Sequence, residues 1–441
     1  MRRSTIHTIL ALIMVACASA QAPVYKPLPA KKLLEYGWDV PQPEQLATAI
    51  RQMETRPFDG VIFRLRDYNH AFDTTPWPVA AIESQVVQLE AIDWRRFSDN
   101  FLTLYAANRD TMDWFDDTDW RVIEGNLRRT AEAARRGGCV GIMFDPEPYG
   151  PNPWLLSDAA PGREFPEVAA QVRRRGAQFI NALQQEMPAI RLLSLYQLSV
   201  VAAMFETEDP ARIDAQLARH HYGLLPAFLD GILDAIGPDA VLIDGNEPAY
   251  YYEDEAPFAE AYVSLAQRAA RLVSPENRPT YRRQSQVGMA IYVDQVLGLR
   301  RPPQGFVAHF MTPQQRLAFL EHNVYWSLAT ADEYAWIYSE RIDWWTGEFP
   351  QGAADAVAAA RSKVTSGASL GFDLDTLVWA AKQQMEAELV ARVEQRSAVI
   401  RRRDPSTPVP AIDGMLDEPV WTSSTELASF QVPAARSDTL Q

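Results

Sequence analysis

The sequence predicts an α/β fold in which eight strands and eight helices alternate to form a (β/α)8 TIM barrel. Short apolar runs alternate with longer amphipathic runs eight times within residues 31–403. Such alternation indicates a parallel sheet covered by helices on both faces, and eight units favour a closed barrel over an open sheet. The open alternative is also disfavoured because no GxGxxG or GxxxxGK[ST] motif follows the first apolar run.

The apolar runs and the amphipathic runs give the expected elements. The predicted strands are residues 33–38, 60–65, 101–106, 140–144, 192–196, 240–243, 287–292 and 334–338. The predicted helices are residues 43–55, 119–136, 166–186, 224–236, 257–273 and 313–329, with residues 92–100 as the candidate for the helix after the second strand. A long terminal helix is expected over residues 375–403.

The N-terminal residues 1–20 have the pattern of a secretory signal peptide. Arg2 and Arg3 precede an apolar run over residues 9–16, and Ala18-Ser19-Ala20 forms a small-residue cleavage site. We therefore expect a secreted or periplasmic protein. Residues 14–17 also resemble a lipobox, and the alternative is a lipid anchor on Cys17 at the cell surface. No later segment is long and uncharged enough to predict a membrane span.

Charge and cysteine content narrow the expected partners and cofactors. The 441 residues carry a formal net charge of -15, which argues against nucleic acid as a partner because phosphate binding needs basic patches. The only cysteines are Cys17 and Cys139, and no Cys/His pattern predicts a zinc site. We expect no cofactor and no catalytic metal, although the acidic strand ends allow a structural calcium ion.

Acidic and aromatic residues follow most of the predicted strands. The active site of a parallel barrel lies at the carboxyl ends of its strands. Glycoside hydrolysis needs two carboxyl groups beside the scissile bond, and aromatic rings stack on the apolar faces of sugars. The candidate catalytic residues are Asp145, Glu147, Asp244, Glu247 and Glu340. The candidate substrate-binding residues are Trp38, Asp39, Arg64, Tyr149, Trp154, Tyr196, Gln197, Tyr250, Tyr292, Tyr338 and Trp344.

The motif Asp145-Pro146-Glu147-Pro148 directly follows the fourth strand. Its two prolines restrict the backbone, and the two-residue spacing places both acidic side chains on one face of an extended segment. We expect Glu147 to be the general acid, with Asp145 tuning it or acting as the nucleophile. Structural alternatives stay open: Asp145 as a turn cap or a partner of Arg64, Glu247 as a binding residue only, and Glu340 in an ion pair with Arg341 or Arg64.

The barrel as a whole resembles the broad superfamily of (β/α)8 glycosidases. Several members place one carboxylate after strand four and another after strand six, seven or eight, so the resemblance implies a glycoside hydrolase. Many retaining members have an Asn-Glu signature after strand four, where this chain has Asp145-Pro146-Glu147. The roles known in those members are therefore not transferred residue by residue.

A proline-rich segment over residues 404–410 predicts a stiff linker after the barrel. Residues 411–421, with the sequence AIDGMLDEPVW, resemble the first strand of family 9 carbohydrate-binding modules. The resemblance implies a truncated C-terminal β-sandwich module over residues 411–441, and we expect the natural chain to continue beyond it.

These observations lead to two functional hypotheses. The first is a secreted glycoside hydrolase that cleaves a polysaccharide or oligosaccharide with paired carboxyl groups. The second is a barrel that binds carbohydrate without cleaving it and serves in surface recognition, because a fold alone does not fix a function. A lyase would favour a basic rim and a deacetylase a metal cluster, and neither pattern is visible.

Overall fold

The structure, a computed structural model, describes residues 30–106, 112–207, 209–300 and 306–395. The chain divides into two compact units, residues 1–378 and 379–441. The first unit contains the barrel, and the described part of the second is helical. The predicted signal peptide, Cys17, the linker and the carbohydrate-binding module all lie outside the described residues.

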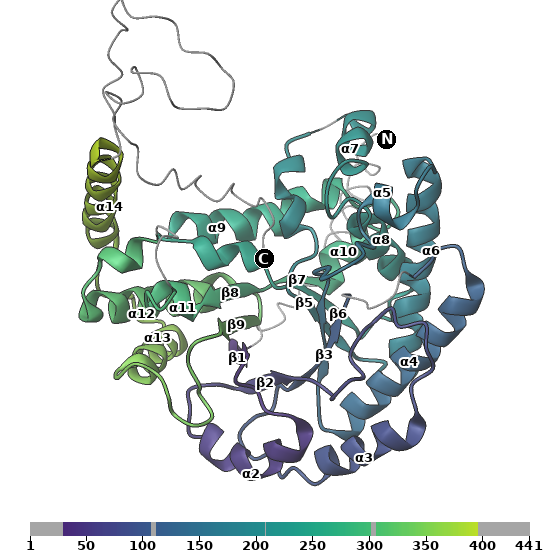
Figure 1. Ribbon diagram of the computed structural model, residues 1–441, viewed down its shortest axis with the longest axis horizontal. Coiled ribbons are helices and arrows are strands. Elements are labelled where there is room, and N and C mark those ends of the chain that lie inside the picture. The colour runs from purple at the N-terminus through teal and green to yellow at the C-terminus, as the bar shows by residue number, and fades with distance from the viewer. Residues whose placement is uncertain (1–29, 107–111, 208, 301–305, 396–441) are drawn as a thin grey trace, which may run out of the picture. The chain divides into compact units, whose positions relative to one another are not determined.

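A parallel barrel of nine strand segments lies at the centre of the first unit, as predicted (Figure 1). The segments are β1 (Lys32–Gly37), β2 (Gly60–Phe63), β3 (Phe101–Tyr105), β4 (Gly141–Asp145), β5 (Arg191–Ser194), β6 (Val241–Asp244), β7 (Ser285–Val287), β8 (Met289–Tyr292) and β9 (Tyr334–Ser339). They lie in the order β7-β6-β5-β4-β3-β2-β1-β9-β8. All eight predicted strands are present, and each boundary lies within two residues of its predicted position.

The seventh predicted strand is divided at Gly288 into β7 and β8. Because each half pairs with a different neighbour, the divided strand joins the two edges of the sheet. β7 pairs with β6, whereas β8 pairs with β9. The backbone N–H of Gly288 donates to the carbonyl of Asp244 at 2.7 Å, and a Cβ at Gly288 would lie 3.1 Å from that oxygen. Glycine at this bend therefore lets one strand turn between two neighbours.

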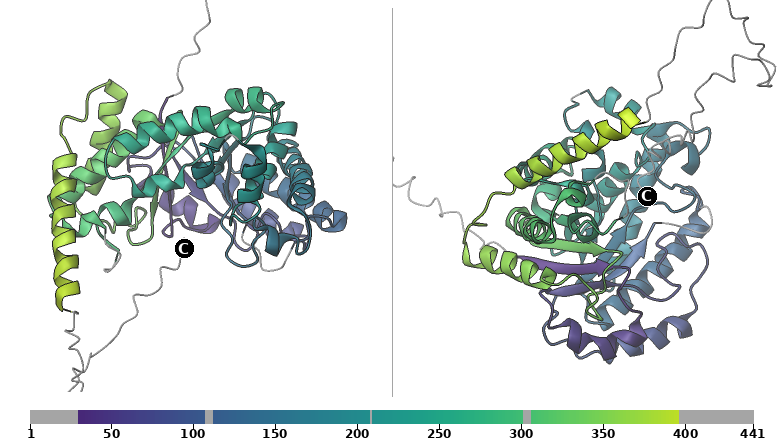
Figure 2. Two further views of the ribbon diagram at one scale, coloured as in Figure 1. Left: turned by 90° about the horizontal axis from the view of Figure 1, so that it is seen from above. Right: turned by 60° about the vertical axis from the view of Figure 1, so that its left-hand side comes forward.

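Helices surround the sheet, and successive helices of the outer layer pack against each other (Figures 1 and 2). The longer ones are α2 (Pro43–Met53), α3 (Val79–Glu90), α4 (Asp117–Arg136), α6 (Phe165–Gln184), α8 (Leu225–Ala235), α12 (Pro313–Thr330) and α13 (Ala353–Ser366). A further helix, α14 (Asp375–Gln395), leads into the second unit. The shorter ones are α5 (Leu156–Ala159), α7 (Pro210–Leu217), α9 (Ala256–Val263), α10 (Arg278–Gln284) and α11 (Val293–Val296). The 3-10 helices are η1 (Ser199–Met204), η2 (Glu247–Tyr251), η4 (Ala269–Arg271) and η5 (Val307–Phe310), and η3 (Ser264–Arg268) is a short π-helix.

The prediction of a helix over residues 92–100 is wrong, because the helix after β2 is α3. α3 buries Ile82, Val86 and Leu89, which have helical spacing. The segment after α3 is held instead by the Glu54 carboxylate, which accepts hydrogen bonds from three consecutive backbone N–H groups, those of residues 95–97. The predicted helix over residues 257–273 is also interrupted, since α9 continues into the π-helical turn η3 and the 3-10 turn η4.

Two glycines allow α6 and α8 to approach closely. A Cβ at Gly176 would lie 2.1 Å from the carbonyl oxygen of Phe228, and a Cβ at Gly231 would lie 1.7 Å from that of Arg173. No side chain fits at these distances, so the backbones of the two helices would have to separate. This close contact holds the helical layer beside β4 and β5.

We predict that Gly231→Ala lowers the free energy of unfolding by about 2–3 kcal/mol, because α6 and α8 must separate. Gly125→Ala is the matched control. Its Cβ would meet only the flexible Arg129 side chain at 3.4 Å, so the higher helix propensity of alanine should stabilise the protein by about 0.5–1 kcal/mol. Chemical denaturation measures both variants, and equal effects would contradict the packing argument.

Candidate active site

The register of the strands decides which acidic side chains face the inside of the barrel. Phe144 points outward, since its ring packs on Phe179 of α6 and Phe228 of α8. Its register partner on β5 is Ser194, whose own partner on β6 is Asp244. Side chains alternate along a strand, so Asp145 points inward while Asp244 shares the outward row of Phe144.

Asp244 is accordingly placed away from the barrel mouth. Its carboxylate accepts hydrogen bonds from the backbone N–H groups of Leu198, Ser199 and Asn246 at 2.8 to 3.0 Å and from the Ser199 hydroxyl at 2.6 Å. Burial raises the pKa of Asp244, and these hydrogen bonds oppose the shift. The contacts give Asp244 a structural role: it fastens the segment after β5 to β6.

Asp145 and Glu147 lie at the carboxyl end of β4, on the rigid turn that Pro146 and Pro148 form. The turn is held by Trp154, whose indole N–H donates to the carbonyl of Pro146 at 2.6 Å. The Asp145 carboxyl is 2 % exposed and accepts from the backbone N–H of Glu147 at 2.9 Å. Burial raises the pKa of Asp145 to about 8.

The Glu147 carboxyl is half-buried. Burial raises its pKa, but the hydroxyl of Tyr149 donates a hydrogen bond to it and opposes the shift. Tyr149 itself is 63 % exposed. Glu147 thus stands between the buried Asp145 and the solvent-facing rim.

Glu247 brings a third carboxyl group to the same place from β6. The preceding residue, Asn246, has a φ of 48°, which turns the backbone sharply after β6. The backbone N–H of Glu247 then donates to the carbonyl of Leu195 at 3.0 Å. Burial, together with the charges of Asp145 and Glu147, raises the pKa of Glu247 to about 8. Three carboxyl groups therefore face one another at the barrel mouth.

A layer of tyrosines surrounds these acids. Tyr36 of β1 and Tyr292 of β8 are both in register with Tyr338 of β9, so the three point inward together. Tyr250 stacks on Tyr338, with ring centroids 5.8 Å apart and planes at 17°. The other members are Tyr105, Tyr196 and Tyr222, and burial raises the pKa of every phenol in the layer.

Glu340 and the rim residues lie on the β9 side of the mouth. The Tyr338 hydroxyl donates to Glu340 at 3.4 Å, and the buried Asp294 carboxylate accepts from the backbone N–H of Glu340 at 2.5 Å. The Trp38 side chain lies beside the Tyr338 hydroxyl and is 72 % exposed. Glu340 therefore belongs to the rim, beside an open aromatic surface.

Arg64, at the end of β2, completes the rim on another side. Its guanidinium lies beside the hydroxyl of Tyr105, which is the register partner of Asp145. Among the described residues, no ion pair joins Arg64 to Asp145 or Glu340.

Four predicted substrate-binding residues lie elsewhere. Trp154 and Trp344 have no exposed surface and pack in aromatic clusters outside the barrel, so neither can stack on a ligand. Asp39 accepts from the backbone N–H of Trp344 at 2.8 Å. Gln197 is 5 % exposed and hydrogen-bonds to the carbonyl of Ile243 at 3.3 Å. We assign these residues to the support of the site.

Sequence reasoning missed three residues of the tyrosine layer. Tyr36 and Tyr105 occupy inward positions of β1 and β3, and the alternation of side chains could have identified them. Tyr222 reaches the site from the segment between α7 and α8. That segment has no periodic pattern, so no signal in the sequence points to Tyr222.

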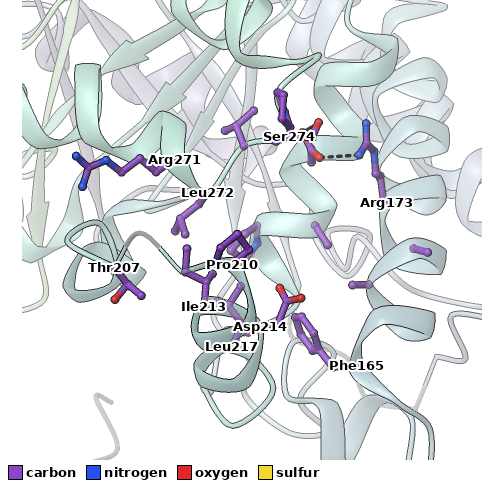
Figure 3. Close-up of a pocket in the computed structure, with 18 of the residues that line it drawn as sticks. Phe165, Arg173, Thr207, Pro210, Ile213, Asp214, Leu217, Arg271, Leu272 and Ser274 are labelled. Atoms are coloured by element: carbon purple, nitrogen blue, oxygen red, sulfur yellow. Dashed lines mark hydrogen bonds and ion pairs between the residues drawn. The ribbon is translucent and has the colours of Figure 1, made fainter.

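A separate pocket of about 650 Å³ lies outside the barrel (Figure 3). α6, α7, α8 and residues 271–278 line it, and none of the predicted site residues does. Its apolar side chains include Phe165, Ile213, Leu217 and Leu272.

Within the described ranges, no group of three or more His, Cys, Asp or Glu residues could hold a metal ion. No described helix is long and apolar enough to cross a membrane.

Comparison with known proteins shows distant likenesses among solved structures. A GH5_18 protein from Bifidobacterium longum subsp. infantis matches with a TM-score of 0.43 and 9% identity, over 76% of this chain and 79% of that chain. The exo-beta-1,4-mannosidase Op5Man5 from Opitutaceae bacterium strain TAV5 matches with a TM-score of 0.42 and 13% identity, over 77% and 60%. A GH18 chitinase from Pseudoalteromonas aurantia gives 0.33 and 10%, over 76% and 99%. No family model and no curated protein matches the chain. At these identities no activity transfers to this protein.

We predict that Asp145→Asn stabilises the protein at high pH. The pKa of Asp145 is raised to about 8 in the folded state, so ionisation favours the unfolded chain between about pH 4 and 8. Asparagine keeps the oxygen that accepts from Glu147 but cannot ionise. The stability difference between variant and wild type should be small at pH 4 and rise to on the order of 5 kcal/mol at pH 8.5, about 1.4 kcal/mol for each of the roughly four pH units between the unfolded and folded pKa values. Thermal unfolding across this range measures it, and a difference that does not change with pH would contradict the assignment.

Proposed function

We propose that this chain is a glycoside hydrolase that uses Glu147 and Glu247 as its paired carboxyl groups, with Asp145 tuning them. The observation that carries the proposal is the convergence of three carboxyl groups from β4 and β6 whose pKa values are raised. Perturbed carboxyl pairs in a cleft are what acid and base catalysis near neutral pH requires.

The spacing of the strands suits this chemistry. β5 lies between β4 and β6. Strands two positions apart in a sheet are separated by roughly 9–10 Å, and glutamate side chains can narrow that distance. Glycosidases place their carboxyl groups about 5–9.5 Å apart, so one sugar linkage fits between Glu147 and Glu247.

The pKa values divide the roles of the two glutamates. Glu247, with its pKa raised to about 8, keeps its proton at neutral pH, which suits a general acid. Glu147 accepts a hydrogen bond from Tyr149, which favours its ionised form and suits a base or nucleophile. This division differs from the sequence expectation, in which Glu147 was the acid.

The rim supports a carbohydrate as the ligand. Trp38, Tyr149 and Tyr251 are exposed aromatic residues at 72 %, 63 % and 47 % of their surface. Aromatic rings present a flat apolar surface with a polar edge, as a sugar ring does. Arg64 and Glu340 add hydrogen-bonding groups beside them. Secretion and attachment to a carbohydrate-binding module, both predicted from the sequence, would place such an enzyme on an extracellular polysaccharide.

The first test is release of reducing ends from a panel of polysaccharides and aryl glycosides by wild type, Glu147→Gln and Glu247→Gln. We expect wild-type cleavage of at least one substrate and a loss of about 10²–10⁴ in kcat for each variant. The variant that lacks the acid should keep more activity on aryl glycosides with good leaving groups, because these need no protonation. Asp158→Asn, an exposed residue of α5, is the control. If the wild type binds glycans from the panel and releases nothing, the non-catalytic alternative replaces this proposal.

The second test is the pH profile. Activity should fall as the pH rises above about 8, since Glu247 then loses the proton that it must donate. It should also fall at low pH as Glu147 becomes protonated. In Glu247→Gln the alkaline fall should disappear from the residual activity on activated aryl glycosides. An unchanged alkaline limb in this variant would assign the acid to another residue.

A further inference from the structure

Two phenols of the tyrosine layer form a pair between the carboxyl groups. Tyr196 follows β5 and is 4 % exposed, and Tyr222 is 6 % exposed. Their ring centroids are 5.0 Å apart. The Tyr196 hydroxyl is buried and makes no well-formed hydrogen bond to a described residue, although the Tyr222 hydroxyl lies beside it. Among the described residues, the two buried hydroxyls thus have only each other as neighbours for hydrogen bonding, and a ligand oxygen would supply the acceptor that the pair lacks.

The pair has a proton available for such a ligand. Each phenol carries one O–H group, so two hydroxyls that face each other use one proton between them and leave one to donate. Both hydroxyls lie in the electrostatic field of Asp145 and Glu247. No hydrogen bond from either hydroxyl to these carboxyl groups is present among the described residues. The remaining O–H group is therefore free to donate to a ligand that lies beside the three carboxyl groups.

Neighbouring residues hold the pair in place. The ring of His221 packs edge-on against Tyr222, with centroids 4.8 Å apart. Asn152, on the loop after β4, donates to the carbonyl of His221 at 2.9 Å. The segment that carries Tyr222 is thus tied to the loop that carries Glu147, and the position of the donor is coupled to that of the proposed carboxyl pair.

The position of the pair selects one atom of the substrate. β5 pairs with both β4 and β6, and Tyr196, which follows β5, lies in the field of Asp145 and Glu247. A sugar held between Glu147 and Glu247 would therefore place its reacting carbon near Tyr196. Two ring atoms flank that carbon, the ring oxygen and C2. The ring oxygen gains positive charge in the oxocarbenium-like transition state, so a donor there would oppose the reaction. An oxygen on C2 accepts a hydrogen bond that strengthens in the transition state.

We propose that the Tyr196–Tyr222 pair donates a hydrogen bond to an oxygen on C2 of the sugar, either a hydroxyl or the carbonyl of an acylamino group. The enzyme then acts on 2-oxygenated or 2-acylamino glycosides and discriminates against 2-deoxy glycosides. This inference rests on the proposed glycoside hydrolase function. Tyr222 and Tyr196 become specificity-determining residues.

The test compares matched aryl glycosides, one with an oxygen acceptor on C2 and one 2-deoxy, for wild type, Tyr196→Phe and Tyr222→Phe. Intrinsic reactivity differs between the two substrates, so the quantity to follow is the change in their kcat/KM ratio between proteins. The ratio is kcat/KM for the 2-oxygenated substrate divided by kcat/KM for the 2-deoxy substrate. We expect each variant to lower this ratio by at least about tenfold, because kcat/KM falls for the 2-oxygenated substrate alone. Tyr334→Phe is the matched control. It removes a buried hydroxyl that donates to Asp99 at 2.8 Å at the opposite end of the barrel, and it should leave the ratio unchanged.

Two outcomes overturn the inference while leaving the proposed function intact. The first is an equal loss on both substrates, which indicates only a structural role, and the second is an unchanged ratio in both tyrosine variants. The matched pair is built on a sugar that the wild type cleaves in the substrate panel, and if the wild type cleaves nothing in that panel, the proposed hydrolase function fails. Calorimetric binding of the same glycosides then decides the donor role. A preference for the C2 oxygen that disappears in Tyr222→Phe supports the pair, and binding without such a preference overturns it.

Discussion

The in-register pairing of β4, β5 and β6 is the constraint on which the candidate site depends. It places Phe144, Ser194 and Asp244 in one outward row and turns Asp145 to the inside. A shift of one residue in β4 would exchange Phe144 and Asp145, burying a carboxylate among the aromatic rings of α6 and α8 and exposing a phenylalanine in the barrel. The aromatic packing outside the sheet and the chemistry inside it are therefore set by the same register.

The arrangement of elements could be read from the sequence because burial on both faces leaves a strong pattern. The apolar runs at residues 101–106 and 192–196 identify strands without reference to anything distant in the chain. The helix after β2 was misplaced because the apolar pattern of α3 is weak. Residues 92–100 also contain apolar positions, but these pack in a loop that hydrogen bonds to Glu54 hold in place. The contribution of Glu54 comes from another element, and no local pattern reveals it.

The site was only partly predictable for a related reason. Asp145, Glu147 and Glu247 follow strands, and that position alone pointed to them. Asp244 has the same kind of position, but the register, which the sequence leaves open, turns it outward. Trp154 and Trp344 are aromatic residues near strand ends that belong to the core. Tyr222 enters from an irregular segment, so its role depends on tertiary packing alone.

Hydrogen-bond saturation separates the structural acids of the barrel mouth from the acids free to act on a ligand. Asp244 accepts four hydrogen bonds and Asp294 accepts two backbone N–H groups, which fixes each carboxylate and the loop that it holds. Within the described part of the chain, no hydrogen bond reaches the Glu247 carboxyl, and Glu147 accepts one from Tyr149.

A buried acid without such partners is costly when charged, so it retains its proton at higher pH. The fold accepts that cost at the carboxyl ends of β4 and β6, whereas it satisfies Asp244 and Asp294 with hydrogen bonds. Since burial without compensation is unfavourable for stability, a ligand that supplies the missing hydrogen bonds would stabilise these groups, so this end of the barrel is suited to bind one.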